Sequence, residues 1–244
     1  MKVGGNTIVI TGGGSGIGLA LAAKFLELDN TVIAIGRDGR RLQGAQNVHP
    51  RLRIFECDVT DHHDVDALLN FLDRHHPDVN MLINNAGVQY NYAFADEDPR
   101  LENARSEIDV NLFAPVRLCK AFLPRLMECK EAAIVNVTSG LAAVPKQSAP
   151  LYSATKAALH MFTKTLRWQL EGSPVSVYEL LPPLVDTAMT AGRGKKKLSP
   201  EAVAEQFVDA MRNGQLEVRV GKTRWLFLVN RIWPGLAERI VRKL

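Results

Sequence analysis

The sequence contains few cysteines and no long apolar run, and both shortages exclude classes of protein. Cys57, Cys119 and Cys129 are odd in number, form no Cys-x-x-Cys pair and lack metal-ligand spacing, so a disulfide scaffold is excluded and no metal is expected. No stretch approaches the roughly 18 continuous apolar residues that span a bilayer, and residues 1–6 lack the apolar core of a signal peptide. We therefore expect reduced cysteines and a cytoplasmic location.

The sequence also has little excess positive charge outside its C-terminal segment. The net charge is +4, and residues 222–244 contain six basic residues against a single acidic one. A nucleic-acid-binding protein would carry its basic charge on a recognisable face or motif, and no such motif is present. We therefore expect no nucleic-acid partner.

Apolar, β-rich segments alternate with helical patterns along the chain. The predicted strands lie at residues 7–11, 31–35, 53–57, 81–83, 133–138, 175–181 and 216–220, and the predicted helices at 17–28, 64–74, 101–127, 151–170 and 200–212. The continuous apolar run at residues 8–10 is typical of a parallel strand covered on both faces. The alternation predicts an α/β fold: a single Rossmann-fold domain over residues 1–244, with a doubly wound, mostly parallel seven-stranded sheet and helices on both faces.

The turn between the first strand and the first helix is rich in glycine. Glycines there permit a tight turn and a close approach to a pyrophosphate, and the helix N-terminus offers free N–H groups. Because the turn directly follows a strand and opens a helix, it predicts a dinucleotide-binding loop. The predicted cofactor-binding residues of this loop are Gly12, Gly14, Ser15, Gly16, Ile17 and Gly18.

The residue after the second strand bears on which dinucleotide is bound. NAD binders usually place an acidic residue there for the ribose 2′-hydroxyl, whereas an arginine accommodates a 2′-phosphate. Here the strand is followed by Gly36 and Arg37, and a guanidinium suits a phosphate. The neighbouring Asp38 could instead reach the ribose after a small shift in register. We expect NADP(H) to be favoured over NAD(H).

Three polar residues suggest proton-transfer chemistry. Tyr152 and Lys156 are four residues apart on a predicted helix and so share one face, while Ser139 follows the predicted fifth strand. Hydride addition to a carbonyl builds negative charge on oxygen, which needs a proton and a polarising hydrogen bond. We expect the Lys156 ammonium to lower the pKa of the Tyr152 phenol.

These motifs together resemble the short-chain dehydrogenase/reductase family in its compact form, over about residues 5–190. The resemblance rests on the glycine loop, Cys57-Asp58-Val59, Asn84-Asn85-Ala86-Gly87, Asn111, Ser139 and Tyr152-Ser153-Ala154-Thr155-Lys156. It implies an NAD(P)-dependent oxidoreductase that moves a hydride between nicotinamide and a carbonyl or alcohol, with Tyr152 as general acid/base. It also implies a small-molecule substrate and a homodimer or homotetramer.

The resemblance assigns roles residue by residue. The implied catalytic residues are Asn111, Ser139, Tyr152 and Lys156, with Asn111 holding a water that joins Lys156 to solvent. The implied cofactor contacts beyond the glycine loop are Arg37, Asp58, Val59, Asn85, Ala86, Gly87, Tyr152, Lys156, Val185 and Thr187. One departure is Pro183, which stands where the family usually has glycine and stiffens the turn. It weakens inference about the substrate more than about catalysis.

Two segments lie outside this core. We expect residues 186–199 to form a loop that closes over substrate, either steering anions with its basic run at 193–197 or simply forming a solvated loop. The basic amphipathic extension at 222–244 fits a helix packed on its own domain, a subunit contact or a membrane-surface helix, and Pro234 would start a second helical segment. Packing or a dimer contact is favoured over the membrane, since apolar stripes at helical spacing usually face a core.

Two other functions share parts of this pattern. A cofactor-binding sensor or regulator without turnover would keep the dinucleotide site, but the presence of both Tyr152 and Lys156 argues for catalysis. An epimerase or dehydratase acting on a nucleotide-sugar shares Tyr-x-x-x-Lys, but such family members are typically longer and have a differently spaced glycine loop.

Overall fold

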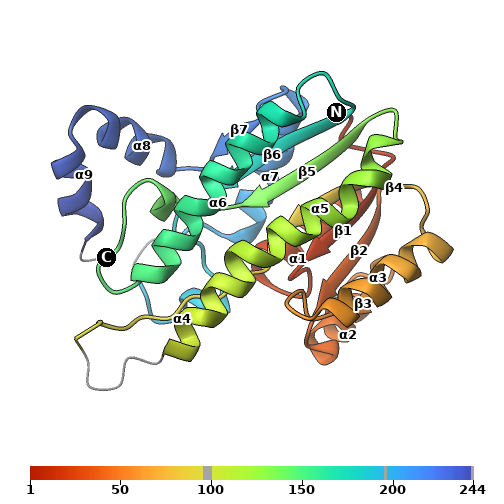
Figure 1. Cartoon of the computed structure of the whole chain (residues 1–244), viewed down its shortest axis with the longest axis horizontal. Coiled ribbons are helices and arrows are strands. Elements are labelled where there is room, and N and C mark those ends of the chain that lie inside the picture. The colour runs from red at the N-terminus through yellow and green to blue at the C-terminus, as the bar shows by residue number, and fades with distance from the viewer. Residues whose placement is uncertain (96–100, 195–196, 243–244) are drawn as a thin grey trace.

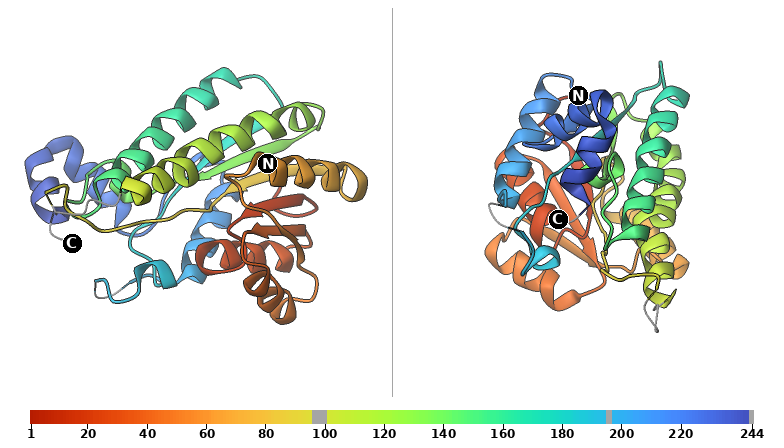
Figure 2. Two further views of the ribbon diagram at one scale, coloured as in Figure 1. Left: turned by 60° about the horizontal axis from the view of Figure 1, so that its bottom comes forward. Right: turned by 90° about the vertical axis from the view of Figure 1, so that its left-hand side faces the viewer.

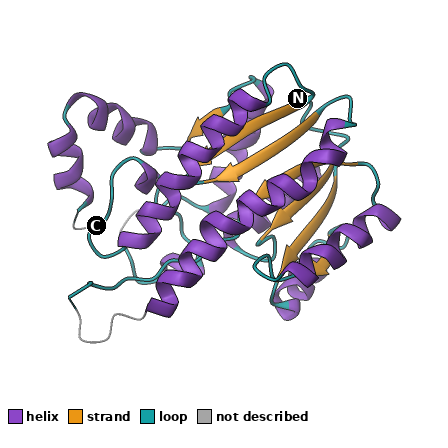
Figure 3. Cartoon of the chain, viewed as in Figure 1, coloured by secondary structure: helices purple, strands orange, loops and turns teal. Residues whose placement is uncertain are grey.

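Seven parallel strands form one sheet in the computed structural model, which describes residues 1–95, 101–194 and 197–242. The sheet confirms the predicted Rossmann-type fold, and its pairings are all parallel rather than mostly parallel (Figure 3). The strands are β1 (Thr7–Thr11), β2 (Thr31–Gly36), β3 (Arg53–Glu56), β4 (Val79–Asn84), β5 (Ala132–Val137), β6 (Val175–Leu181) and β7 (Glu217–Arg219), in the order β3-β2-β1-β4-β5-β6-β7. The strand order reverses between β1 and β4, which is where ligands bind in folds of this kind.

Helices cover both faces of the sheet (Figure 1, Figure 2). One face packs against α1 (Gly16–Glu27), α2 (Gly39–Val48) and α7 (Pro200–Arg212). The other packs against α3 (His62–His75), α5 (Ala114–Met127) and α6 (Pro150–Gln169). A further helix, α4 (Leu101–Ile108), leads through a π-helical turn at Asp109–Phe113 into α5, and α8 (Thr223–Ile232) and α9 (Pro234–Val241) complete the described chain. Among the described residues, no helix has the length and apolarity needed to cross a membrane.

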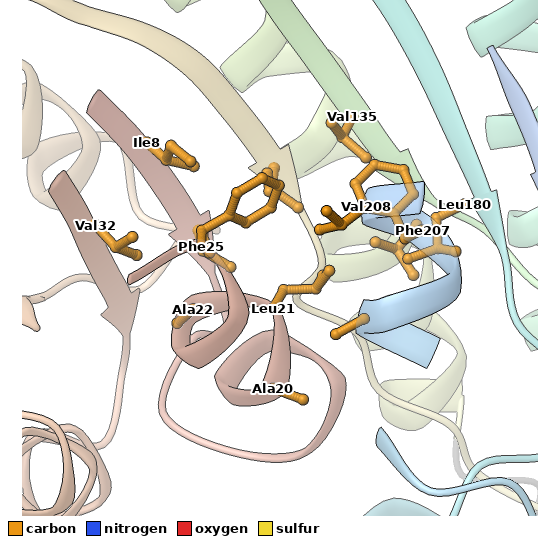
Figure 4. Close-up of a cluster of buried hydrophobic side chains, with 14 of the residues drawn as sticks. Ile8, Ala20, Leu21, Ala22, Phe25, Val32, Val135, Leu180, Phe207 and Val208 are labelled. Carbon is orange, nitrogen blue, oxygen red and sulfur yellow. The ribbon is translucent and has the colours of Figure 1, made fainter. Parts of the chain in front are cut away.

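The core explains why the strands read as continuous apolar runs. Ile8 and Ile10 on β1 pack toward α1 and α7, whereas Val9 between them packs toward α3 and α5. Because both faces of the sheet are covered, every position of β1 is buried. Figure 4 shows Phe25 of α1 and Phe207 and Val208 of α7 in one buried cluster on this face of the sheet.

The structure departs from the predicted elements in a few places. Helix α2 was not predicted, because only two of its side chains, Leu42 and Ala45, are buried and it contains two glycines. The predicted helix at 101–127 is α4, the π-helical turn and α5 in succession, with Pro115 in the first turn of α5 and Pro124 inside it. The tail forms two helices divided before Pro234, as predicted.

Candidate active site

The turns that follow β1 and β4 are held together at the point where the strand order reverses. The Thr11 hydroxyl accepts hydrogen bonds from the backbone N–H groups of Asn85 (2.9 Å) and Ala86 (2.8 Å). The Asn85 side-chain amide donates to the carbonyl oxygens of Thr11 (2.9 Å) and Gly12 (3.3 Å). These bonds fix the glycine turn against the end of β4, where the sequence placed the cofactor.

Glycine is required at two positions of this turn. Gly12 and Gly16 have φ angles of +64° and +53°, a region that side chains with a Cβ adopt at a cost. A Cβ at Gly16 would also lie 3.1 Å from the Thr187 side chain, on the loop after β6. Ser15 precedes α1 in an extended conformation, and its side chain forms no capping hydrogen bond. The helix N-terminus therefore keeps N–H groups that an anion can bind.

The end of β2 presents Arg37 rather than an acidic residue. Arg37 is exposed. Asp38, the alternative ribose ligand, is instead engaged at the start of α2: its carboxylate accepts from the Arg41 backbone N–H (3.2 Å) and pairs with the Arg41 Nε (3.1 Å). Because Arg37 is exposed and Asp38 is engaged with Arg41, the Arg37 guanidinium is the group available to a ligand at the end of β2.

Asp58 and Val59 follow β3. The Asp58 carboxylate accepts hydrogen bonds from the backbone N–H (2.8 Å) and the hydroxyl (2.7 Å) of Thr60. The backbone N–H of Asp58 donates to the Asp64 carboxylate (2.8 Å). Val59 is 7% exposed, and its carbonyl accepts a hydrogen bond from Arg117. The segment is thereby held rigidly at the carboxyl edge, and its contact with the adenine stays a prediction.

Ser139, Tyr152 and Lys156 are brought together beyond β5. Ser139 comes after Thr138 at the end of that strand, and its side chain lies close enough to Tyr152 to lower the pKa of the phenol. Its Oγ also accepts from the N–H of Leu141 (3.1 Å), which caps the 3-10 turn at Gly140–Ala142. Lys156 lies one turn along α6 from Tyr152, with its Nζ 5.8 Å from the centre of the phenol ring.

The pKa values of Tyr152 and Lys156 differ from those expected from the sequence. Burial raises the pKa of Tyr152 to about 12, and this effect exceeds the lowering by the hydrogen bond to Ser139 and by the positive charge of Arg193. Burial also lowers the pKa of Lys156 to about 8. The predicted lowering of the Tyr152 pKa by Lys156 is therefore wrong for the cofactor-free chain. The physical reason is that burial dominates the Tyr152 pKa, while the Lys156 Nζ donates to the Val137 carbonyl (2.9 Å).

Asn111 lies in the π-helical turn between α4 and α5 and is fully buried. Its amide donates to the Val88 carbonyl (2.8 Å), while its oxygen accepts from the Val88 N–H (2.9 Å). A Cβ at Gly87 would lie 3.1 Å from the Asn111 oxygen and 3.7 Å from the Lys156 Nζ. Asn111, Gly87 and Lys156 thus form one close-packed group, in which a water held by Asn111 stays a prediction.

The loop after β6 meets the glycine turn from the opposite side. Val185 is 3% exposed and forms an isolated parallel β-bridge with Leu198. The Thr187 N–H donates to the Thr190 hydroxyl (3.2 Å). Val185 and Thr187 therefore reach the same edge as the other candidate cofactor residues, with Thr187 beside Gly16.

The predicted substrate loop, residues 186–199, is partly ordered by its own basic residues. Lys197 bonds the Asp186 carboxylate (3.2 Å) and the Thr190 carbonyl (2.6 Å), closing the loop on itself. Burial lowers the pKa of Lys146, and the nearby positive charge of Arg193 adds to this effect. The same charge partly offsets the burial that raises the pKa of Tyr152. Lys195 and Lys196 lie outside the described residues, so the role of the whole basic run stays a prediction.

Two buried carboxylates beside this group were not found from the sequence. Glu179 on β6 is fully buried and accepts from the Thr138 hydroxyl (2.6 Å), while both of its oxygens contact the Nδ1 of His160 (2.8 and 2.9 Å). Glu107 on α4 is also fully buried, accepts from the Tyr90 N–H (2.8 Å), and has its pKa raised by burial. For His160, the four-residue spacing from Lys156 was the signal that could have been used.

Comparison with known proteins agrees with this geometry. Residues 6–198 match the family model described as short chain dehydrogenase. The chain is 42% identical over 224 residues to a Bacillus subtilis (strain 168) protein named "Uncharacterized oxidoreductase DltE", with 89% of each chain covered.

Solved structures resemble the whole chain as well. A short chain dehydrogenase from Burkholderia cenocepacia J2315 in complex with NADP has a TM-score of 0.87 at 29% identity and covers 99% of both chains. The closed form of a serine dehydrogenase complexed with NADP+ has a TM-score of 0.78 at 27% identity, covering 84% of this chain and 88% of the other. The fold and the site define a dinucleotide-dependent oxidoreductase of the dehydrogenase/reductase class. The chain belongs to the short-chain dehydrogenase/reductase family.

The family implies a nicotinamide dinucleotide, and the residues present fit such a group. A Cβ at Gly12 would lie 3.1 Å from the Ala86 Cα, so only glycine leaves this backbone in place. The N-terminus of α1 opens beside it, and the Ser15 side chain makes no cap bond that would compete for those N–H groups. Within the described ranges, no group of His, Cys, Asp and Glu side chains could hold a metal ion.

Proposed function

We propose that this protein reduces a carbonyl or oxidises the corresponding alcohol, with Tyr152 exchanging the proton and Ser139 and Lys156 assisting. The observation that carries the proposal is the grouping of three side chains: Ser139 lies close enough to Tyr152 to affect its pKa, and Lys156 lies one helical turn from Tyr152 and beside Gly87 at the switch point of the sheet. When bound, the nicotinamide supplies or accepts the hydride.

The residues of the chain account for the rest of the chemistry. Ser139 and Tyr152 both present hydroxyl groups, which donate hydrogen bonds to the substrate oxygen and so polarise the carbonyl. Tyr152, with a pKa of about 12, holds its proton at neutral pH and passes it to that oxygen as the negative charge develops. Lys156, with a pKa of about 8, is still mostly protonated at neutral pH, and its positive charge favours the phenolate that remains. Alcohol oxidation runs the same proton transfer in reverse.

NADP(H) is the cofactor we propose, on the evidence of the end of β2. The exposed Arg37 guanidinium suits a 2′-phosphate, and the Asp38 carboxylate is committed to capping α2. The NADP-bound solved structures support the same choice.

Assembly is proposed from exposed apolar side chains on α5 and its neighbour α6. Met127, Met161 and Trp168 are 45%, 59% and 61% exposed, which is unusual for side chains of this size on a solvated helix face. With the oligomers common in the family, they support a homodimer or homotetramer. The free cysteines support a reducing, cytoplasmic compartment.

The test is turnover of NADPH and NADH at 340 nm with aldehydes, ketones, diketones, quinones and 3-oxoacyl compounds. Tyr152→Phe should reduce kcat by about 10²–10⁴-fold, the usual contribution of a positioned proton donor. Tyr178→Phe, the same change in the core, is the matched control and should keep activity. Tight NADPH binding without turnover in either direction would favour the sensor or regulator instead.

A further inference from the structure

The C-terminal helices carry a second apolar face that their own domain does not use. The inward side chains of α8 and α9, among them Leu226, Ala237 and Val241, pack on the loop after Ser139, around Val144. The outward side chains are large, apolar and about half exposed: Trp225 56%, Leu228 45%, Ile232 55%, Trp233 64%, Leu236 44% and Ile240 53%. The predicted packing of the tail on its own domain therefore accounts for only one of its two apolar faces.

Helical geometry shows that the outward residues of α8 form one stripe. Trp225, Leu228 and Ile232 recur at spacings of three and four on α8, so they lie on one side of the helix. Arg224 and Arg231 occupy the adjoining strip, and the Arg224 guanidinium lies 5.4 Å from the Trp225 ring centre. Figure 1 shows α8 and α9 together at one end of the molecule, where Phe227 of α8 contacts His160 of α6 edge-on.

The charge around this stripe is nearly all positive. Its cations are Lys222, Arg224, Arg231, Arg239 and Arg242, against Glu238 alone within residues 222–242. Among the described residues, Lys222, Arg224, Arg231 and Arg239 form no ion pair with an acidic side chain. These side chains are therefore available to pair with negatively charged groups outside the domain.

We propose that the outward face of α8 and α9 docks on an anionic lipid bilayer. Apolar side chains rimmed by arginine, with tryptophans at the boundary, fit the headgroup region of a membrane. The helices have 10 and 8 residues, so they lie along the surface rather than crossing it. A second copy is a poorer occupant, because a two-fold contact would set the same cations opposite one another.

Docking through this face brings the candidate active site near the bilayer. The Gly140 Cα, next to Ser139, would carry a Cβ only 3.4 Å from Leu226 of α8. The Asn230 amide donates to the Ala143 carbonyl (3.2 Å), and the Gln147 N–H donates to the Arg242 carbonyl (3.3 Å). The membrane face and the loop that begins at Ser139 are thus one packed unit.

The experiment is co-sedimentation of the full-length protein with phosphatidylcholine vesicles, with and without phosphatidylglycerol. We expect binding to the anionic vesicles only, weakening as salt is raised. Each basic side chain near an anionic surface strengthens binding by about five-fold, so Arg224→Gln with Arg231→Gln should weaken it by about 25-fold. Arg74→Gln with Lys130→Gln, both exposed elsewhere, removes the same charge and should have a smaller effect.

Tryptophan fluorescence supplies a second readout, because two of the three tryptophans lie on this face. Anionic vesicles should shift the wild-type emission to shorter wavelength. Trp225→Ser with Trp233→Ser removes these two reporters and should abolish sedimentation, whereas Val48→Ser, an exposed apolar side chain on α2, should preserve both sedimentation and the shift.

Three outcomes would overturn the proposal. The first is no sedimentation of the wild type with anionic vesicles. The second is an equal loss in the Val48→Ser control. The third is a change of oligomeric state in the Trp225/Trp233 variant, which would make this face a contact between copies. None of these outcomes bears on turnover, so the proposed reaction stands or falls separately.

Discussion

Replacing Lys156 by methionine should abolish turnover and yet stabilise the cofactor-free protein at neutral pH. Lys156 is only 4% exposed, and burial lowers its pKa from 10.5 to about 8. Each unit of that difference corresponds to about 1.36 kcal/mol, so below pH 8 the protonated lysine costs the fold about 3 kcal/mol. Methionine has a similar length and no charge to desolvate.

Two effects determine the net result. Loss of the Nζ bond to the Val137 carbonyl (2.9 Å) costs about 1 kcal/mol, which leaves a net gain of about 2 kcal/mol near neutrality. Because the pKa of Lys156 is lowered in the folded state, the unfolded chain binds more protons, and wild-type stability rises with pH between about 8 and 10.5. The advantage of the methionine variant should therefore shrink almost to zero by about pH 9.5.

The assay is urea unfolding of both proteins at about pH 6.5 and about pH 9.5, without cofactor. Lys130→Met, an exposed lysine in the turn before β5, is the matched control and should show little change at either pH. If Lys156→Met were no more stable than wild type at the lower pH, or equally stabilised at both, the account of Lys156 as a buried and destabilising charge would be wrong.

Three further predictions concern other residues. Arg37→Ser should weaken NADPH binding by about 10- to 100-fold, since a charge-assisted contact contributes about 1.5–3 kcal/mol, and should leave NADH binding unchanged in the same fluorescence titration; equal weakening of both would exclude a 2′-phosphate contact. His160→Leu leaves the buried Glu179 without its partner and should cost about 3–5 kcal/mol in urea unfolding, much of it recovered when Glu179→Leu is added; full additivity would show that the two residues do not interact. Gly12→Ala, at a φ of +64°, should cost about 1–2 kcal/mol and weaken NADPH binding, whereas Gly235→Ala, with open space around it, should do neither; matching melting temperatures would refute the need for glycine.

Much of the fold could be predicted because buried parallel strands have a distinctive sequence. Residues 8–10 and 32–35 are apolar throughout, and the structure places both segments in interior strands of the sheet. Short or sparsely buried elements could not be found in this way. Strand β4 extends to Val79–Asn84 rather than 81–83, because its polar ends are ordered by side-chain bonds, such as that from the Asn80 amide to Asn6 (3.0 Å).

The site was predictable where the chemistry depends on spacing along one element. Ser139, Tyr152 and Lys156 meet because one follows a strand and the others share a helix face. The direction of the Tyr152 pKa shift was not predictable, since it depends on burial and on where the Lys156 Nζ points. The π-helical turn that holds Asn111 has no sequence signal comparable to a glycine loop.

The inward face of α6 unites these observations. Tyr152, Lys156 and His160 follow one another at four-residue spacing, so a helix that should bury apolar side chains here presents three polar ones. Each meets a polar group at the carboxyl ends of β5 and β6: the Ser139 hydroxyl, the Val137 carbonyl and the Glu179 carboxylate. Buried polar groups persist only when they are paired in this way. The strand ends that face substrate and cofactor in the proposed reaction thus also supply partners for the polar side chains on the inward face of α6.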